Sequence, residues 1–334
     1  MNNALLYIGG LLVVVLASLF AIPHFVDWNS YRGVFEEEAS RVLGRDVRIG
    51  GAVNLRLLPA PYISLEKLKI ADPSSSTGES LFRAEGFTLW LSVPPLLKGV
   101  FEANKIEVRR PVVQLVASPE GGGNWQSLTI NTGQMPLIPQ GVSLQSVTIT
   151  DGALVIGTTG RPEIVRLDAI DGELMAETLN GPYKFSGTLT ADGTKRDVRV
   201  ATSAAEPGQD LRFKANVRSM ASGNNYTVSG RAIDIQGRAK VEGELTASIN
   251  VTALASAAVA PENIPKSEVT AKIAGDATGV EFKDIAVTLA QAATPQLVSG
   301  SAKVSWPERT KIELSLASRW LDFDKLLGDG KVVP

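Results

Sequence analysis

Hydrophobic and polar residues alternate with a period of two along most of the chain after residue 46. In the first such stretch, residues 47–57, apolar side chains fall on alternate positions, with Arg48, Asn54 and Arg56 between them. The same alternation recurs as far as residues 312–316. This period is typical of strands that bury one face and leave the other in water. The pattern predicts a mainly β protein.

The segment before the first strand has a different period. Residues 27–45 place apolar side chains at spacings of three and four, which predicts an amphipathic helix. Asp27 or Asn29 can cap its start, and Gly44 can end it. Its apolar stripe either closes one end of the β-structure or lies on a membrane surface. The acidic residues at 36–38 would be repelled by anionic lipid and favour the first alternative.

The N-terminus carries a long uncharged segment, residues 4–25. As a helix it would span about 33 Å, against a hydrocarbon core of about 30 Å. We expect residues 1–26 to form a retained single-pass anchor, with a cytoplasmic N-terminus and with His24 and Trp28 at the membrane interface. A cleaved signal peptide is the alternative, but the start lacks basic residues and the best cleavage site, Leu19-Phe20-Ala21, places the bulky Leu19 at the −3 position.

The amino-acid composition argues against several classes of function for this protein. The 33 basic and 35 acidic residues nearly balance, and no basic cluster with interleaved aromatic residues is present, so we expect no nucleic-acid partner. The chain has no cysteine and one histidine, which excludes disulfides, thiolate metal sites and multi-histidine sites. Nucleotide-binding, zinc-protease and nucleophile-elbow motifs are missing from the sequence. We therefore expect no enzyme activity, no catalytic residues, no metal and no cofactor.

Turn signals divide the alternating region into short strands. The Asp-Gly pairs at 151–152, 171–172 and 192–193 are hairpin signals, and "SVTITDGALVIG" is interpreted as two strands joined by a two-residue turn. Connections of this length join antiparallel neighbours. The soluble part is therefore predicted to be antiparallel β nearly throughout.

A degenerate repeat runs through the first half of the chain. Residues 66–73, 104–111 and 145–152 each place two apolar residues around one polar residue and then a turn signal. The repeats begin 38 and then 41 residues apart. Short β motifs also resemble one another by chance, so the repeat is only suggestive.

Four motifs in the first 130 residues occur in a fixed order. The first is Gly-Arg-x-Val-x-Ile, followed by a glycine after one extra residue, and the second is a Leu-Pro-x-Pro turn. The third is Pro-Leu-Leu-x-Gly, and the last is an Asn-Trp turn after glycines. The matching residues are Gly44, Arg45, Val47, Ile49 and Gly51; Leu58, Pro59 and Pro61; Pro95, Leu96, Leu97 and Gly99; and Asn124 and Trp125.

This ordered set resembles the N-terminal region of the AsmA family. The resemblance implies a Gram-negative inner-membrane protein with one N-terminal anchor and a periplasmic β-rich body. It also implies a relation to bridge-like lipid transfer proteins, which carry phospholipid along a hydrophobic groove. The expected domains are the anchor at 1–26, the amphipathic helix at 27–45, an AsmA-like β region at 46–130 and a continuing β region at 131–334. Since members are usually longer, we expect this last region to be cut short at its C-terminal end.

The number of strands adds a physical argument. About 290 residues at about 12 residues per strand and turn give roughly 24 strands, and open sheets rarely exceed about 10 without curling or splitting. The predicted fold is a transmembrane helix and an amphipathic helix followed by a long curled antiparallel sheet that forms a groove. A β-sandwich or β-solenoid with a dry core shows the same alternation and is the alternative.

The predicted function is to bind phospholipid and channel it along this groove from the inner membrane toward the outer membrane. Envelope proteins are candidate partners at the distal end. The alternative is a scaffold that influences outer-membrane protein assembly and envelope integrity through protein partners. The predicted groove residues are apolar positions of the first strands: Val47, Ile49, Val53, Leu55, Leu57, Ile63, Leu65, Leu68, Ile70, Phe87, Leu89, Leu91, Ile106, Val108, Val147 and Ile149.

Overall fold

The computed structural model describes the chain from Phe25 to Trp320 with several gaps. The described ranges are 25–58, 60–72, 78–96, 103–126, 144–176, 178, 180–206, 208–234, 238–250, 267–289, 296–306 and 309–320. The predicted anchor and His24 therefore lie outside the described residues, apart from the last residues of that segment. No helix within these ranges is long and apolar enough to cross a membrane.

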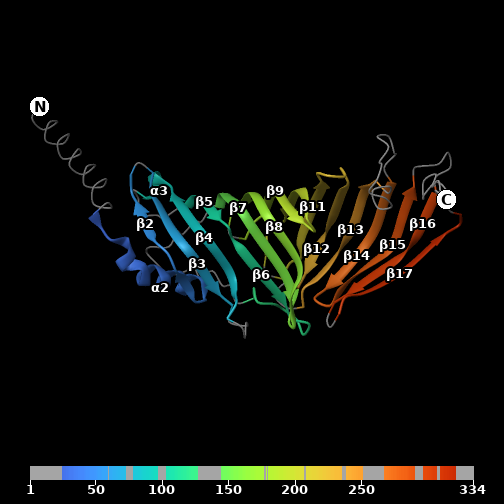
Figure 1. Cartoon of the computed structure of the whole chain (residues 1–334), viewed down its shortest axis with the longest axis horizontal. Coiled ribbons are helices and arrows are strands. Elements are labelled where there is room, and N and C mark those ends of the chain that lie inside the picture. The colour runs from blue at the N-terminus through green and yellow to red at the C-terminus, as the bar shows by residue number, and fades with distance from the viewer. Residues whose placement is uncertain are drawn as a thin grey trace, which may run out of the picture. The chain divides into compact units, whose positions relative to one another are not determined.

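The described residues form a mainly β structure with one mixed sheet of 17 strands. A sandwich would instead divide its strands between two packed sheets. By contacts the chain divides into two units: the first is Met1–Gln114, Asn124–Leu154 and Asp171–Leu179, and the second is Leu115–Gly123, Val155–Ile170 and Asn180–Pro334. Figure 1 labels the elements along the chain.

The helices and the strands up to β8 have the following bounds: η1 Trp28–Tyr31, α2 Arg32–Leu43, β1 Val47–Ile49, β2 Val53–Arg56, β3 Tyr62–Ala71, β4 Ser80–Leu91, α3 Val93–Leu96, β5 Ala103–Arg109, β6 Val112–Ala117, β7 Leu144–Thr158 and β8 Arg161–Ala176. The remaining strands are β9 Tyr183–Ala191, β10 Thr194–Thr202, β11 Leu211–Ser219, β12 Asn225–Ile233, β13 Lys240–Ile249, β14 Ser267–Asp276, β15 Gly279–Leu289, β16 Gln296–Ser305 and β17 Lys311–Ser318.

The predicted amphipathic helix consists of the short 3-10 helix η1 followed by α2. Asp27 caps η1 by accepting a hydrogen bond from the Asn29 backbone N–H at 3.0 Å. Gly44 ends α2 in the left-handed region with φ of 63°. Phe35, Ala39 and other apolar residues of the helix pack against a buried cluster on the first strands. The helix therefore closes one end of the β-structure, as the first interpretation of its apolar stripe predicts.

The first unit contains a parallel pair of strands, whereas its other strand pairs with a known register are antiparallel. β1 and β2 both pair antiparallel with β3, and β3, β4 and β5 follow as antiparallel neighbours. β5 and β7, however, are parallel, with Ile106 opposite Val147 and Val108 opposite Ile149. The prediction of an antiparallel sheet was wrong here, because the chain between these strands is long enough for the crossover that parallel pairing needs.

The parallel pair explains two of the sequence repeats. Ile106 and Val147 occupy equivalent places in repeats 104–111 and 145–152, which begin 41 residues apart. Since these residues are directly opposite each other, the two repeats lie side by side and in register. The repeat therefore marks neighbouring strands of one sheet in this part of the chain.

Only one of the three Asp-Gly pairs makes the predicted hairpin. Asp192 and Gly193 have φ of 50° and 70° and join β9 to β10, as a turn with two positive φ values requires. Residues 151–152 lie inside β7 and residues 171–172 inside β8, so these two hairpin predictions were wrong. At Asp151 a φ of 53° kinks a strand that continues.

In the second unit, the strands from β9 to β17 form a regular meander. Each strand pairs antiparallel with the next one along the chain. The register shifts within β14–β15 and again within β15–β16, close to Asp284, whose φ is 50°. Pairing between consecutive strands is the usual arrangement in antiparallel sheets, and it holds here even for β13 and β14, which the longer stretch 250–266 separates.

Candidate functional site

Most of the predicted groove residues lie in two rows that cross the first unit. Residues directly opposite each other in paired strands have their side chains on the same face of the sheet. The first row consists of Leu55, Ile63, Leu89, Ile106 and Val147. The second row consists of Val53, Leu65, Phe87, Val108 and Ile149. Side chains far apart in sequence therefore form one continuous apolar face.

A kink in β3 brings two further predicted residues onto this face. Lys67 has a φ of 53°, and a left-handed residue interrupts the alternation of a strand. Beyond it, Leu68 pairs with Ile49, and Ile70 pairs with Val47. All four contribute to one apolar cluster. The one-residue shift of the apolar pattern in this part of the sequence thus has its cause at Lys67.

Helix α2 covers one end of the apolar face. Val47, Ile49, Val53 and Leu68 are only 1%, 3%, 1% and 7% exposed. Trp28, the predicted interface residue, packs against them together with Phe35, Ala39 and Leu43. This end of the face is filled by the protein itself, so a ligand would contact the rows beyond it.

The rest of the face in the first unit is partly open. Val108, Val147 and Leu91 are buried, the first two in a cluster with Ala84. The other predicted groove residues are half-buried: Leu55, Leu57, Ile63, Leu65, Ile70, Phe87, Leu89, Ile106 and Ile149. These half-buried side chains are the part of the face that a ligand could reach.

The second unit has its own apolar face, which the predicted residue set did not include. One row consists of Leu211, Ala232, Val241, Gly275, Val280, Val304 and Ile312. Another consists of Val198, Val217, Tyr226, Ala247, Val269, Val287 and Val298. The helices among the described residues all precede β5, so no described helix lies within this unit. The same period-two signal in the sequence could have identified these rows.

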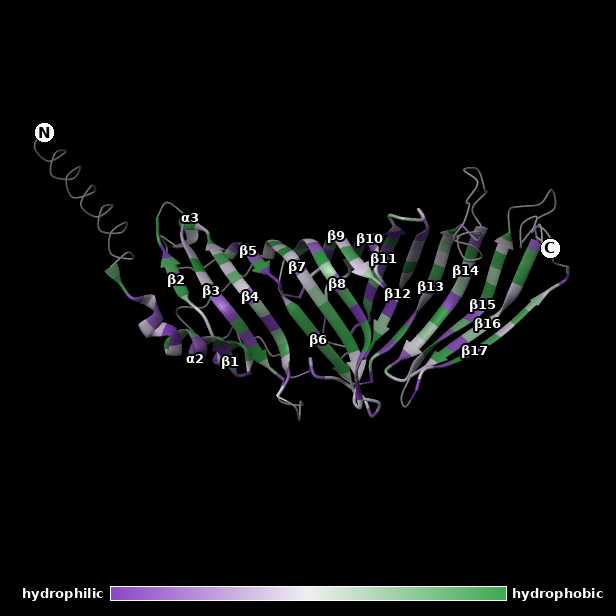
Figure 2. Ribbon diagram, in the orientation of Figure 1, coloured by the Kyte–Doolittle hydropathy of each residue, from purple (hydrophilic) through white to green (hydrophobic). Residues whose placement is uncertain are grey.

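The opposite face of the strands is polar and charged. Arg231 pairs with Glu242 at 2.9 Å, and Lys272 pairs with Asp284 at 2.8 Å. The hydrogen bond from Lys272, helped by its charge, holds the pKa of Asp284 below its usual value. Figure 2 shows the resulting alternation of hydrophobic and hydrophilic residues along individual strands. One face therefore suits water and the other suits hydrocarbon.

Two of the sequence motifs meet in a buried polar network of the first unit. Arg45 donates from Nη2 to the backbone carbonyl of Asn124 at 2.5 Å and from Nη1 to that of Ala71 at 3.3 Å. Asn124 donates from Nδ2 to Asp72 at 2.7 Å and to the Gln114 carbonyl at 2.9 Å. The network ties the end of α2 to the strand β3 and to the glycine-rich turn.

The fold and this site define a class of protein: a mainly β protein with one mixed sheet, whose two units each carry an apolar face opposite a polar one, with a helix over one end of the apolar face in the first unit. The sequence profile of the AsmA family matches residues 2–174. The chain belongs to the AsmA family, as its motifs indicated. A search of curated proteins found no match.

Proposed function

We propose that the protein binds phospholipid through the acyl chains and lets it move along the apolar face of the sheet. The observation that carries this proposal is the continuity of the apolar rows, which cross β2, β3, β4, β5 and β7 without an intervening polar side chain. Further rows of the same kind cross β10 to β17 in the second unit.

The energies involved fit a carrier that needs no catalysis. Shielding one CH₂ group from water is worth about 0.8 kcal/mol, so an acyl chain of about 16 carbons strongly favours an apolar face over water. Adjacent strands are about 4.8 Å apart, so a chain that slides across them exchanges one set of aliphatic contacts for a similar set. Transfer of this kind is a non-enzymatic function.

We place this function at the inner membrane of a Gram-negative cell, with the body of the protein in the periplasm. Membership of the AsmA family and the uncharged segment at residues 4–25 support this location. The proposed direction is toward the outer membrane, with an envelope protein as partner at the distal end.

Photo-crosslinking at neighbouring positions on opposite faces tests the proposal. Leu89 is a half-buried residue of the first apolar row. Leu245, also half-buried, lies between Val241 and Ala247 on the apolar face of the second unit, where it is opposite Val228 and Ala271. Thr150 and Thr246 are exposed residues of the polar face. A photoreactive amino acid at either leucine should capture phospholipid in cells, and one at either threonine should not.

The pattern of adducts also separates the proposal from the scaffold alternative. The proposal would be refuted if neither leucine position gave a lipid adduct while the protein was present in the membrane fraction. Protein adducts at the threonine positions, combined with full function after a charge is placed at Leu245, would support the scaffold instead.

A further inference from the structure

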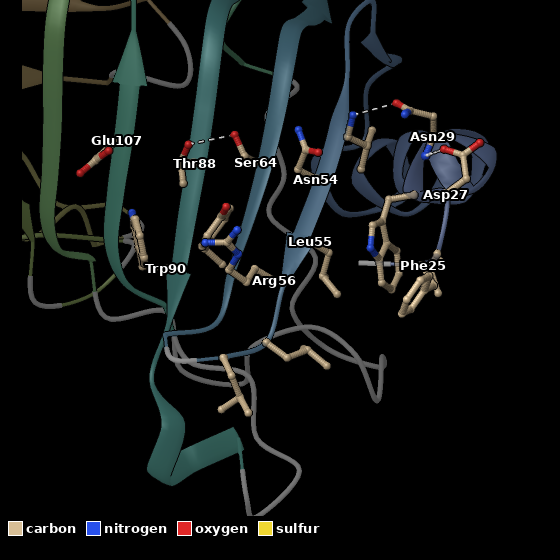
Figure 3. A pocket seen from close by; sticks show the side chains of 16 residues that line it. Phe25, Asp27, Asn29, Asn54, Leu55, Arg56, Ser64, Thr88, Trp90 and Glu107 are labelled. Atoms are coloured by element: carbon tan, nitrogen blue, oxygen red, sulfur yellow. Dashed lines mark hydrogen bonds between the residues drawn. The ribbon is translucent and has the colours of Figure 1, made fainter. Parts of the chain in front are cut away.

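A pocket of about 970 Å³ lies beside β2 in the first unit, at the edge of the strand that faces away from β3. Its lining includes the six consecutive residues 53–58. Since consecutive residues of a strand point to opposite faces of the sheet, the pocket contacts both faces of β2. The pocket therefore includes the strand edge itself. Residues 25–29 form its outer wall, where Asn29 accepts a hydrogen bond from the Val53 backbone N–H at 3.0 Å. Figure 3 shows this arrangement.

The floor of the pocket is a polar patch on the face opposite the apolar rows. Arg56, Tyr62 and Trp90 are directly opposite one another across β2, β3 and β4. A second row beside it consists of Asn54, Ser64, Thr88 and Glu107. Figure 3 shows side chains of both rows on one side of the strands.

The first row places a cation over the ring of Tyr62, and the Trp90 ring lies next to that ring at a tilt of 50°. The Arg56 guanidinium carbon lies 5.8 Å from the centre of the Tyr62 ring, and the Tyr62 and Trp90 rings are 4.9 Å apart. Within the described part of the chain, Arg56 forms no ion pair with a carboxylate. The indole N–H of Trp90 is buried and has no hydrogen-bond partner among the same residues.

The carboxylates around the pocket are already engaged. Glu107 pairs with Lys105 at 2.6 Å, and Asp27 accepts the Asn29 backbone N–H. The Ser64 and Thr88 hydroxyls bond each other at 3.1 Å, which uses one of their two protons and leaves the other to donate outward. The patch therefore offers a guanidinium, an amide and one hydroxyl proton, and the indole N–H of Trp90, which has no partner among the described residues, is buried in the same row. Together these donors suit an anion with several acceptor oxygens.

A phosphate matches this set of donors best. Arginine binds phosphate through its planar fork of N–H groups, and the charge strengthens each hydrogen bond. Tyrosine and tryptophan side chains suit the zone between hydrocarbon and water, where lipid headgroups lie. At the strand edge the lining changes to Leu55, Leu57 and Leu58, which suit hydrocarbon.

We propose that this pocket binds the phosphate of a glycerophospholipid, whose acyl chains pass over the edge of β2 toward the apolar face. This proposal rests on the proposed function, because the pocket would be the site where phospholipid first binds before it moves along the apolar face. Phe25, which lines the pocket, is the last residue of the uncharged segment that we expect to be the anchor. The pocket would then lie close to the bilayer surface.

A fluorine NMR titration of the full chain in a non-ionic detergent tests this pocket. The protein carries 5-fluorotryptophan, and the Trp90 signal is assigned with the variant Trp90→Phe. The probes are dihexanoylphosphatidylglycerol, a short-chain phospholipid, and inorganic phosphate. We expect the Trp90 signal to shift with the phospholipid at a concentration about tenfold or more below that needed for inorganic phosphate.

The variant Arg56→Gln should weaken the phospholipid effect by about tenfold or more, the size expected for a charge-assisted hydrogen bond. The control Arg231→Gln removes a charge from the polar face of the second unit and should leave the titration unchanged. Arg56→Lys keeps the charge without the planar fork and should give an intermediate effect. An unchanged far-ultraviolet circular dichroism spectrum shows that each variant is folded.

Three outcomes would overturn the proposed phospholipid site. The Trp90 signal could shift with neither probe, it could shift at equal concentrations of both probes, or the titration of folded Arg56→Gln could equal that of the wild type. Equal effects would indicate a site for free phosphate. The crosslinking experiment at Leu89 shows whether only the pocket proposal fails or the proposed function fails as well. If those crosslinks persist while the titration fails, the pocket proposal falls and the proposed function stands.

Discussion

Asn124 connects three segments of the first unit from a buried position. Its side chain donates to Asp72 and to the Gln114 carbonyl, and its own carbonyl accepts from Arg45. The asparagine and the arginine stood out in the sequence as parts of two separate motifs. Their contact could not be predicted, because 79 residues separate them in the sequence. A sequence motif does not show which other motif lies near it in the folded chain.

Replacing Asn124 with alanine should destabilise the first unit. The substitution removes the donor to the buried Asp72 carboxylate, and an unsatisfied buried polar group costs about 1–3 kcal/mol. We expect a clear fall in the thermal unfolding midpoint of the full chain. Gln209→Ala is the control, since its hydrogen bond to Glu206 is exposed and its loss should have little effect. An unfolding midpoint unchanged by Asn124→Ala would show that the network does not stabilise the fold.

At the scale of elements, period-two alternation predicted the strands and their faces well. It located β2, β3, β4 and β13 because each has one apolar face, and it separated the α2 helix by its different period. The Asp-Gly hairpin signal failed at residues 151–152 and 171–172, which lie inside continuous strands. The parallel pairing of β5 and β7 was also missed, because strand partners distant in sequence are not encoded in local alternation.

The kink in β3 gives a test at this scale. Lys67 has a left-handed backbone, which costs a residue with a Cβ atom about 1–2 kcal/mol and a β-branched residue more. Lys67→Val should therefore lower stability, whereas Lys67→Gly should change it by less than about 1 kcal/mol. Lys69→Val, at a neighbouring exposed position of the same strand, is the matched control and should be tolerated. Chemical denaturation of the three variants measures the difference.

If Lys67→Val were as stable as Lys69→Val, the left-handed conformation at this position would not be required. The placement of Leu68 and Ile70 on the face of Leu65 would then need another cause. The prediction therefore tests how the apolar face continues past the irregularity in β3.

For the whole molecule, the sequence predicted a β-rich protein with one apolar and one polar face, and its motifs indicated the AsmA family. The list of predicted groove residues ended at Ile149, although the rows of the second unit have the same character. The sequence favoured a helix that closes one end of the β-structure, but it could not show which residues of the face α2 covers, because this depends on tertiary packing. The pocket at the β2 edge combines residues 25–107 and carries no motif.

If the apolar face holds phospholipid, the purified full chain should carry it. Mass spectrometry of the detergent-purified protein should find bound phospholipid. Leu245→Glu places a charge within an apolar row and should reduce the amount, because burying an unpaired carboxylate against acyl chains is costly. Thr246→Glu places the same charge on the polar face and should leave the lipid content unchanged. Purified protein without phospholipid, or equal lipid content in the wild type and folded Leu245→Glu, would contradict the account.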